Sequence, residues 1–179
     1  MTWIQTYTGR KAHPFNLAPD EIDIEDIARS LSRIVRFNGH TAGPWGYSVA
    51  QHSVLVSLAV PAADALWGLL HDAHEAYMGD VTSPLKSALR VQQGSLRHFA
   101  DVERAASEAV AKSFGLPWPP PASVRHADDV LLATEARDLC PGNWIDGLPA
   151  PLERTIRAWT PMGAEKQFLA RFAELSTNP

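Results

Sequence analysis

The segment that most constrains the fold is the run AADALWGLLHDAHEAYM, residues 62–78, which has a strongly helical composition and is unusually apolar. A helix that is apolar around most of its circumference must be covered on several sides, so we expect this segment to cross the centre of the domain. Pro61 suits the first position of such a helix, and Gly79 is expected to end it.

Amphipathic segments surround this central one. Ile24, Ile27, Leu31 and Ile34 recur at steps of three and four, which predicts a helix over residues 23–36. Further helices are expected over about 48–60 with Ser48 as N-cap, about 95–114, about 123–139 with Ser123 as N-cap, and about 164–175.

The remaining segments predict short connections. NGHTAGPWGY, DVTSPLK and PGNWIDGLPAP are expected to be loops, and LPWPPPAS a rigid connector. No convincing strand alternation or internal repeat occurs, so we predict an all-α fold. Residues 1–22 are expected to form an irregular arm or short hairpin and residues 23–179 one compact helical domain.

Composition excludes several classes of function. The formal charge of −4 provides no general basic field, so no nucleic-acid polymer is expected as a partner. One cysteine, Cys140, offers neither an internal disulfide nor a cysteine metal cluster. No run approaches the roughly 18 apolar residues of a membrane span, and no leader pattern is evident, so we expect a cytoplasmic protein that does not enter membranes.

Polar residues within the apolar central helix indicate a metal site. His71, Asp72 and Glu75 are spaced to project toward one side of a helix, and burying them unpaired would be costly. His52 on the preceding helix and Asp128 on a later one add an imidazole and a carboxylate. A lone helical histidine is more often a hydrogen-bonded core residue than a ligand, so only the combination predicts a metal site. Such donors suit Mn, Co, Zn, Fe or Ni better than Ca.

Three parts of the sequence resemble the HD-domain phosphohydrolases, particularly the small 5'-deoxynucleotidase branch: QHS, LLHDAHEAYMGDVTSPLK and the later AD. The resemblance covers roughly residues 23–139. It implies a helical fold, a homo-oligomer, and a divalent transition metal held by His52, His71, Asp72 and Asp128. It also implies that Glu75 orients or deprotonates the attacking water, so the expected activity is hydrolysis of a phosphoric ester.

The resemblance further implies how a nucleotide is bound. Asp80 corresponds to a residue that contacts the sugar hydroxyl, and Arg36 and Phe37 to an arginine and an aromatic that meet the phosphate and base. Related enzymes often have Trp in place of Phe37, so base stacking is expected to be weaker or the base preference different. Lys86 is a further candidate for the phosphate. The plainer interpretation is a solvated helix end for Arg36 and Lys86 and a turn residue for Asp80.

Several functions fit this pattern. A nucleoside 5'-monophosphatase acting on (deoxy)nucleotides is favoured over a dNTP triphosphohydrolase, although Arg10 and Lys11 in TGRK would favour the triphosphate if they extended the pocket across a subunit contact. A catalytically silent nucleotide-binding module of the same fold, or a structural helical partner protein without a metal, would be the non-enzymatic alternatives.

Overall fold

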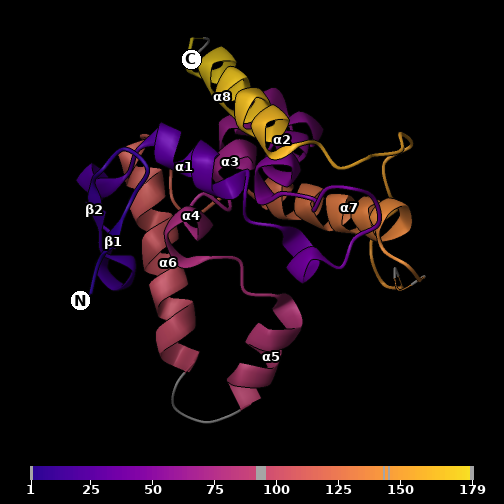
Figure 1. Cartoon of the computed structure of the whole chain (residues 1–179), viewed down its shortest axis with the longest axis horizontal. Coiled ribbons are helices and arrows are strands. Elements are labelled where there is room, and N and C mark those ends of the chain that lie inside the picture. Colours follow the sequence, from indigo (N-terminus) through magenta and orange to yellow (C-terminus); the bar gives the residue numbers. More distant parts are fainter. Residues whose placement is uncertain (1, 92–95, 143, 145, 178–179) are drawn as a thin grey trace.

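The fold is all-α, as predicted, with one short hairpin at the N-terminus (Figure 1). The structure, a computed structural model, describes residues 2–91, 96–142, 144 and 146–177. The helices are α1 (Ile24–Leu31), α2 (Val49–Ala59), α3 (Ala65–Leu70), α4 (Glu75–Met78), α5 (Ser83–Val91), α6 (Leu96–Ser113), α7 (Ala122–Leu139) and α8 (Pro161–Thr177), and the hairpin pairs β1 (Ile4–Gln5) with β2 (Lys11–Ala12).

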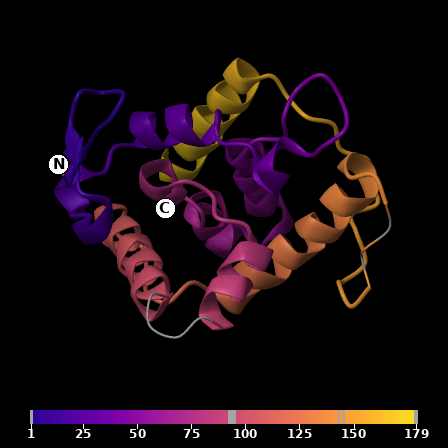
Figure 2. The ribbon, with the colours of Figure 1, turned by 60° about the horizontal axis from the view of Figure 1, so that its bottom comes forward.

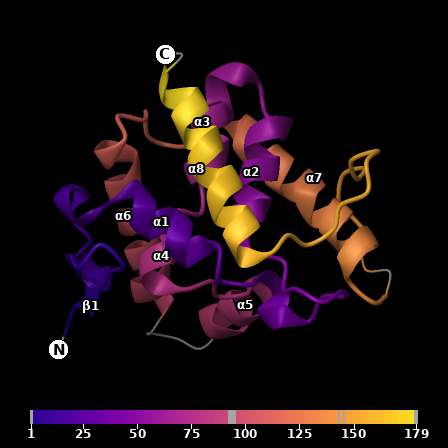
Figure 3. The same cartoon turned by 45° about the horizontal axis from the view of Figure 1, so that its top comes forward.

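The helices pack around the pair formed by α2 and α3. Helix α8 lies across both of them, and α7 packs against the other side of α2 (Figure 3). The hairpin lies beside α6 at one end of the molecule, and α7 lies at the opposite end (Figure 2). In the part of the chain that the structure describes, no helix is both long and apolar enough to cross a membrane.

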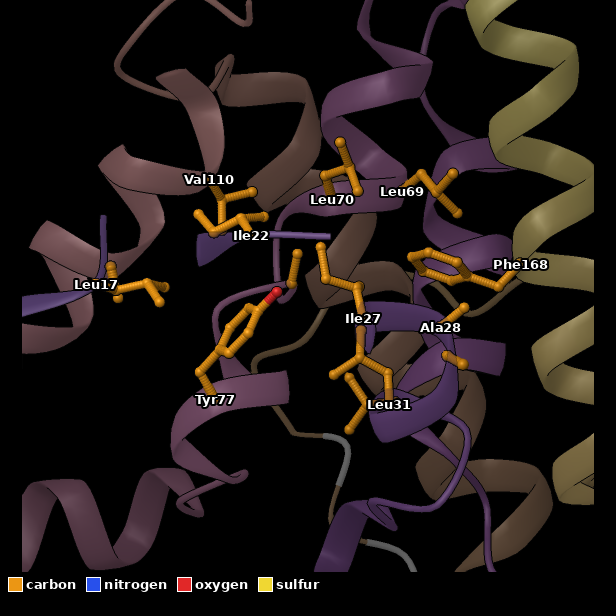
Figure 4. Close-up of a cluster of buried hydrophobic side chains, with 14 of the residues drawn as sticks. Leu17, Ile22, Ile27, Ala28, Leu31, Leu69, Leu70, Tyr77, Val110 and Phe168 are labelled. Carbon is orange, nitrogen blue, oxygen red and sulfur yellow. The ribbon is translucent and has the colours of Figure 1, made fainter. Parts of the chain in front are cut away.

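Two clusters of buried side chains hold this arrangement together, and α3 contributes to both. Leu69 and Leu70 belong to the larger cluster, whereas Trp67 belongs to the smaller one next to α7. In the larger cluster, Ile27 lies between Phe168 of α8 and Tyr77 of α4 (Figure 4). The expectation that residues 62–78 cross the centre is therefore confirmed.

The first helix is shorter than predicted. It begins after its N-cap Asp23 but ends at Leu31 rather than near residue 36. Beyond it the backbone becomes extended, because Val35 forms an antiparallel bridge with Ser48. These backbone groups hydrogen-bond across to a distant segment, so they are not available to continue the helix.

The central helix is not continuous either. It divides into α3 and α4, and residues 71–74 between them form a tight turn in which the amide of Ala73 bonds to the carbonyl of Leu70, and that of Glu75 to the carbonyl of Asp72. Bonds between residues i and i+3 give about three residues per turn. Asp72 and Glu75 therefore lie nearly above one another on the same side.

Two other local predictions were wrong. The segment DVTSPLK was expected to be a loop, but its last four residues form the first turn of α5, where Pro84 is well tolerated because the first amides of a helix have no intrahelical partner. Helix α7 begins at Ala122, and Ser123 does not cap it; the hydroxyl of Ser123 instead donates to Asp64 at 2.5 Å.

The N-terminal arm is attached to the helices by polar and apolar contacts. Asp26 is buried on α1 and accepts hydrogen bonds from the amide of Thr8 at 2.7 Å and its hydroxyl at 2.8 Å. Ala12 and Leu17 join the larger core cluster. The hairpin is thus held against the domain by residues of its own and of α1.

Candidate metal centre and pocket

Three of the four predicted ligands, His52, His71 and Asp72, come together in one group, and the fourth, Asp128, lies beside His52. Nε2 of His52 lies 3.3 Å from Nε2 of His71 and 3.1 Å from Oδ1 of Asp128. Oδ2 of Asp72 lies 3.2 Å from Nε2 of His71 and 3.9 Å from that of His52. Helix α2 thus supplies one imidazole, the turn after α3 the second imidazole and a carboxylate, and α7 the other carboxylate.

Hydrogen bonds on the far side of each ring orient the two imidazoles. Nδ1 of His52 lies 2.5 Å from Oε1 of Glu135, and Nδ1 of His71 lies 2.9 Å from the carbonyl oxygen of Gly68. A carboxylate and a carbonyl only accept hydrogen bonds, so both Nδ1 atoms are donors. Both Nε2 atoms therefore remain to face the carboxylates of the site.

The geometry fits a metal ion. Two ligand atoms that each lie about 2.0–2.2 Å from one ion are separated by about 3–3.6 Å. The separations of Nε2 of His52 from Nε2 of His71 and from Oδ1 of Asp128 are of this size. His52, His71 and Asp72 offer ligand atoms that all lie within 4.8 Å of one another, a group that does not include Asp128. Two imidazole nitrogens and two carboxylates suit a divalent transition ion.

The pKa values of the ligands reflect how strongly these groups interact. Burial and the charge of Arg36 act to lower the pKa of His52, but Glu135 and Asp128 raise it to about 9. Burial also acts against the charged form of His71, yet Asp72 raises the pKa of that ring. The neighbouring carboxylates thus shift both imidazoles toward their protonated forms relative to a free histidine.

A pocket of about 640 Å³ opens beside the four donors. This volume lies within the range of about 300–1,000 Å³ that is usual for small-molecule sites. All of the predicted catalytic and substrate-binding residues line it, together with two of the four predicted ligands: Arg36, Phe37, Asp72, Glu75, Asp80, Lys86 and Asp128. The two histidines lie behind this lining.

Arg36 reaches the pocket from a strained backbone rather than from a helix. Its amide donates to the carbonyl of Tyr47 at 2.9 Å, which fixes the start of the short 3-10 turn over residues 36–39. Phe37 and Asn38 in this turn have φ values of 55° and 50°, a conformation that costs free energy in residues other than glycine. The turn directs Arg36 and Phe37 toward the same cavity.

Both basic residues of the lining are already paired with carboxylates. Nε of Arg36 lies 3.1 Å from Oε2 of Glu135, and its Nη1 lies 3.7 Å from Oδ2 of Asp72. Nζ of Lys86 lies 2.7 Å from Oε1 of Glu103 on α6. Neither side chain is the freely solvated helix end of the plainer interpretation.

Glu75 and Asp80 add two further carboxyl groups to the lining of the pocket. Glu75 is buried, and its Oε2 has no hydrogen-bond partner among the described residues. Burial first, and then the charges of Asp72 and Asp80, raise the pKa of Glu75 to about 10. Burial also raises the pKa of Asp80, which follows Gly79 at the end of α4.

The structure adds two residues that the sequence analysis did not single out. Glu135 is fully buried and contacts both His52 and Arg36. It lies two helical turns after Asp128, so its place within an apolar helix face was a detectable signal. Trp144 lines the pocket with its ring centroid 6.0 Å from that of Phe37, at an interplanar angle of 62°. No periodic pattern marks Trp144, because it belongs to an irregular segment.

Arg10 and Lys11 of the arm do not line this pocket. Arg10 pairs with Asp23 at 3.0 Å, and the ammonium of Lys11 lies 4.7 Å from the ring centroid of Trp3. Within one copy of the chain, Arg10 is therefore engaged with the N-cap residue of α1 and Lys11 with an aromatic ring of the arm.

Comparison with known proteins finds relatives over nearly the whole chain. One relative, the uncharacterized protein YfdR of Escherichia coli K12, is 37% identical over 181 aligned residues, which cover 98% of this chain and 97% of the relative. An uncharacterized protein of Rhodobacter capsulatus is 36% identical over 142 residues, or 75% of this chain and 69% of its own length. No protein-family model matches the sequence.

Proposed function

The chain belongs to the same family as the uncharacterized protein YfdR of Escherichia coli, and from its own site we propose that it is a metal-dependent phosphohydrolase of the HD superfamily that releases phosphate from (deoxy)nucleoside 5'-monophosphates. The observation that carries the proposal is the group formed by His52, His71 and Asp72, with Asp128 in contact with His52, at the edge of a cavity of nucleotide size. A structural helical protein has no need for such a group of donors beside an open pocket.

The residues around the donors suit hydrolysis of a phosphate ester. When bound, a divalent ion supplies positive charge that neutralises phosphoryl oxygens, activates water at neutral pH and lowers the pKa of nearby Glu75. The oxygen of water then forms a bond to phosphorus, and the bond from phosphorus to the 5'-oxygen breaks. Glu75 accepts the water proton, and the departing 5'-oxygen takes up a proton from solvent to become the hydroxyl of the nucleoside.

The rest of the pocket is suited to holding a nucleoside and its phosphate. Arg36 provides a guanidinium beside Asp72, close enough to stabilise charge on phosphoryl oxygens. Phe37 and Trp144 offer aromatic faces for a base, and Asp80 offers an acceptor for a sugar hydroxyl. Lys86 adds a positive charge at the start of α5.

The charge of the lining favours a monophosphate over a triphosphate. Arg36 and Lys86 are the basic side chains among the lining residues, and both are paired with carboxylates. Asp72, Glu75, Asp80, Asp128 and Asp129 also line the cavity. A triphosphate would bring about two more negative charges than a monophosphate into a pocket that is already acidic.

The test begins with metal analysis of the purified protein, followed by phosphate-release and chromatographic assays of nucleoside mono- and triphosphates with Mn, Co, Zn, Fe or Ni. We expect bound metal and release of inorganic phosphate from monophosphates. His71→Ala should abolish both metal binding and hydrolysis, whereas His126→Ala, at an exposed position of α7, should preserve both. Release of triphosphate would instead establish the triphosphohydrolase.

A variant at Glu75 distinguishes an enzyme from a catalytically silent module that only binds nucleotides. If the protein is an enzyme, Glu75→Gln should retain the metal and nucleotide but lose hydrolysis by at least about 100-fold, the usual contribution of a general base. If wild-type protein binds nucleotide and metal without hydrolysis, the enzymatic proposal is wrong. Cytoplasmic location and self-association stay predictions from the sequence.

A further inference from the structure

Glu135 is placed to act on two parts of the site at once. Its side chain is fully buried on α7, two turns beyond Asp128. One carboxylate oxygen lies 2.5 Å from Nδ1 of His52, and the other lies 3.1 Å from Nε of Arg36. Each oxygen thus has its own partner, one behind the metal site and one beside the phosphate pocket.

Each of these contacts has a chemical consequence. A carboxylate that accepts from Nδ1 of His52 holds the ring in one orientation and leaves Nε2 toward the other donors; such partners typically change metal affinity by about 10–100-fold. The bond to Nε of Arg36 fixes the guanidinium, and its Nη1 lies 3.7 Å from Oδ2 of Asp72, which lines the pocket.

Burial of the Glu135 carboxylate costs free energy unless nearby groups stabilise its charge. A carboxylate removed from water loses its hydration, and only close positive or donor groups offset that loss. Burial alone acts to raise the pKa of Glu135, but Arg36 and His52 hold it below its usual value. Arg36 is itself only slightly exposed, so the charges of Arg36, Glu135 and His52 are stabilised mainly by one another rather than by water.

We propose that Glu135 is a positioning residue that couples the two halves of the site, orienting His52 as a metal ligand and Arg36 as the phosphate-facing cation. This inference rests on the proposed function for the role of Arg36, but not for the orientation of His52. Glu135 is neither a proposed metal ligand nor a group placed against the reacting atoms, and it acts through His52 and Arg36.

Two substitutions test the coupling. In Glu135→Gln, the amide carbonyl can accept from His52, but the amide nitrogen then meets Arg36 as a second donor, so only one contact is retained. Glu135→Asp keeps the charge but is shorter by one methylene, so it cannot reach both partners. Glu165→Gln is the matched control, since Glu165 bridges Arg29 and Arg33 at 3.3 and 2.9 Å outside the pocket.

The readouts separate positioning from a structural role. We expect Glu135→Asp to weaken Co²⁺ binding by about 10–100-fold and to alter the visible absorption spectrum of the Co²⁺-loaded protein. Glu135→Gln, which keeps an acceptor for His52, should weaken Co²⁺ binding less. Both variants should also raise KM for the nucleotide. The gain in Tm on adding Co²⁺ should shrink as well, because that gain depends on metal affinity and not on the stability of the metal-free fold. The control should match wild type in all four.

Unchanged Co²⁺ affinity, spectrum and KM in the Glu135 variants would overturn the proposal. If neither variant folds, the wild-type protein decides: nitrogen-15 NMR of the Zn²⁺-loaded protein should show His52 protonated at Nδ1, and a proton on Nε2 instead would overturn the inference. Wild-type protein that binds metal but hydrolyses no nucleotide would refute only the proposed function and leave the effect on His52 testable. Wild-type protein that binds no metal would overturn both.

Discussion

The close approach of α3 to α2 at Gly68 sets the distance between the two imidazoles, and Gly68→Ala should disturb it. A Cβ at this position would lie 2.9 Å from Cα and 3.1 Å from N of Ser57 on α2. Carbon atoms normally approach to about 3.5–4.0 Å. Because the obstructing atoms belong to the backbone of a helix, they cannot rotate away, and α2 and α3 have to separate.

The magnitude follows from two opposing effects. Overpacking in a core costs about 1–3 kcal/mol, and the upper half of that range applies where backbone meets backbone. Replacing a helical glycine by alanine returns about 1 kcal/mol through helix propensity. The free energy of unfolding should therefore fall by about 1–2 kcal/mol, which lowers Tm by about 2–8 °C in a chain of this size.

Thermal unfolding followed by circular dichroism, with chelator and then with Co²⁺, measures both consequences. Metal affinity should fall as well, because His71 lies one turn after Gly68 and its Nδ1 bonds to the Gly68 carbonyl. The matched control is Gly163→Ala on α8, where the nearest atom is the side-chain oxygen of Thr160 at 3.1 Å rather than a backbone atom, so Tm should not fall. A Gly68→Ala protein with the Tm and Co²⁺ affinity of this control would refute the reasoning.

Three further predictions use other parts of the molecule. Trp144→Ala should raise KM for a nucleotide about 5- to 150-fold, because about 1–3 kcal/mol of base stacking is lost. The control is Trp45→Ala, an exposed position outside the pocket lining, which should leave KM unchanged; steady-state phosphate release measures both. Metal binding at pH 7 should release protons, because the pKa of His52 is raised to about 9 and that of His71 is also raised. For the same reason the metal affinity should rise toward pH 9 and then level off. Calorimetry in buffers of different ionisation enthalpy tests this, and no proton release at pH 7 would contradict it. Phe168→Ala should cost about 3–5 kcal/mol, because the ring is fully buried, and urea unfolding showing a loss below about 1 kcal/mol would contradict the assigned core.

The parts of the site that sequence reasoning located are those governed by local rules. His71, Asp72 and Glu75 stood out because polar residues in an apolar segment need partners, and short spacing places them on one side. Composition could not show that the segment breaks between α3 and α4, since the residues of the turn have helical backbone angles at both ends and differ mainly in their hydrogen bonds.

Pairing between segments distant in the sequence explains why the end of α1 was not predicted. The end of α1 depends on the bridge between Val35 and Ser48, and the periodicity of isoleucine and leucine through Ile34 gives no sign of that partner. The same bridge leads into the strained turn at Phe37 and Asn38. A helix continued to residue 36 would have avoided this strain, so the cost of the turn is met by contacts that place Arg36 and Phe37 at the pocket.

Charge at the centre of the site links these observations to a divalent ion. Arg36 and Glu135 contribute one positive and one negative charge in direct contact, which cancel. Asp72 and Asp128 then contribute two uncompensated negative charges beside the Nε2 atoms of the two histidines. Two positive charges would balance them, either as protons on both imidazoles or as one divalent cation. A single ion satisfies the charge while leaving both rings neutral, and neutral imidazole is the form that binds metals.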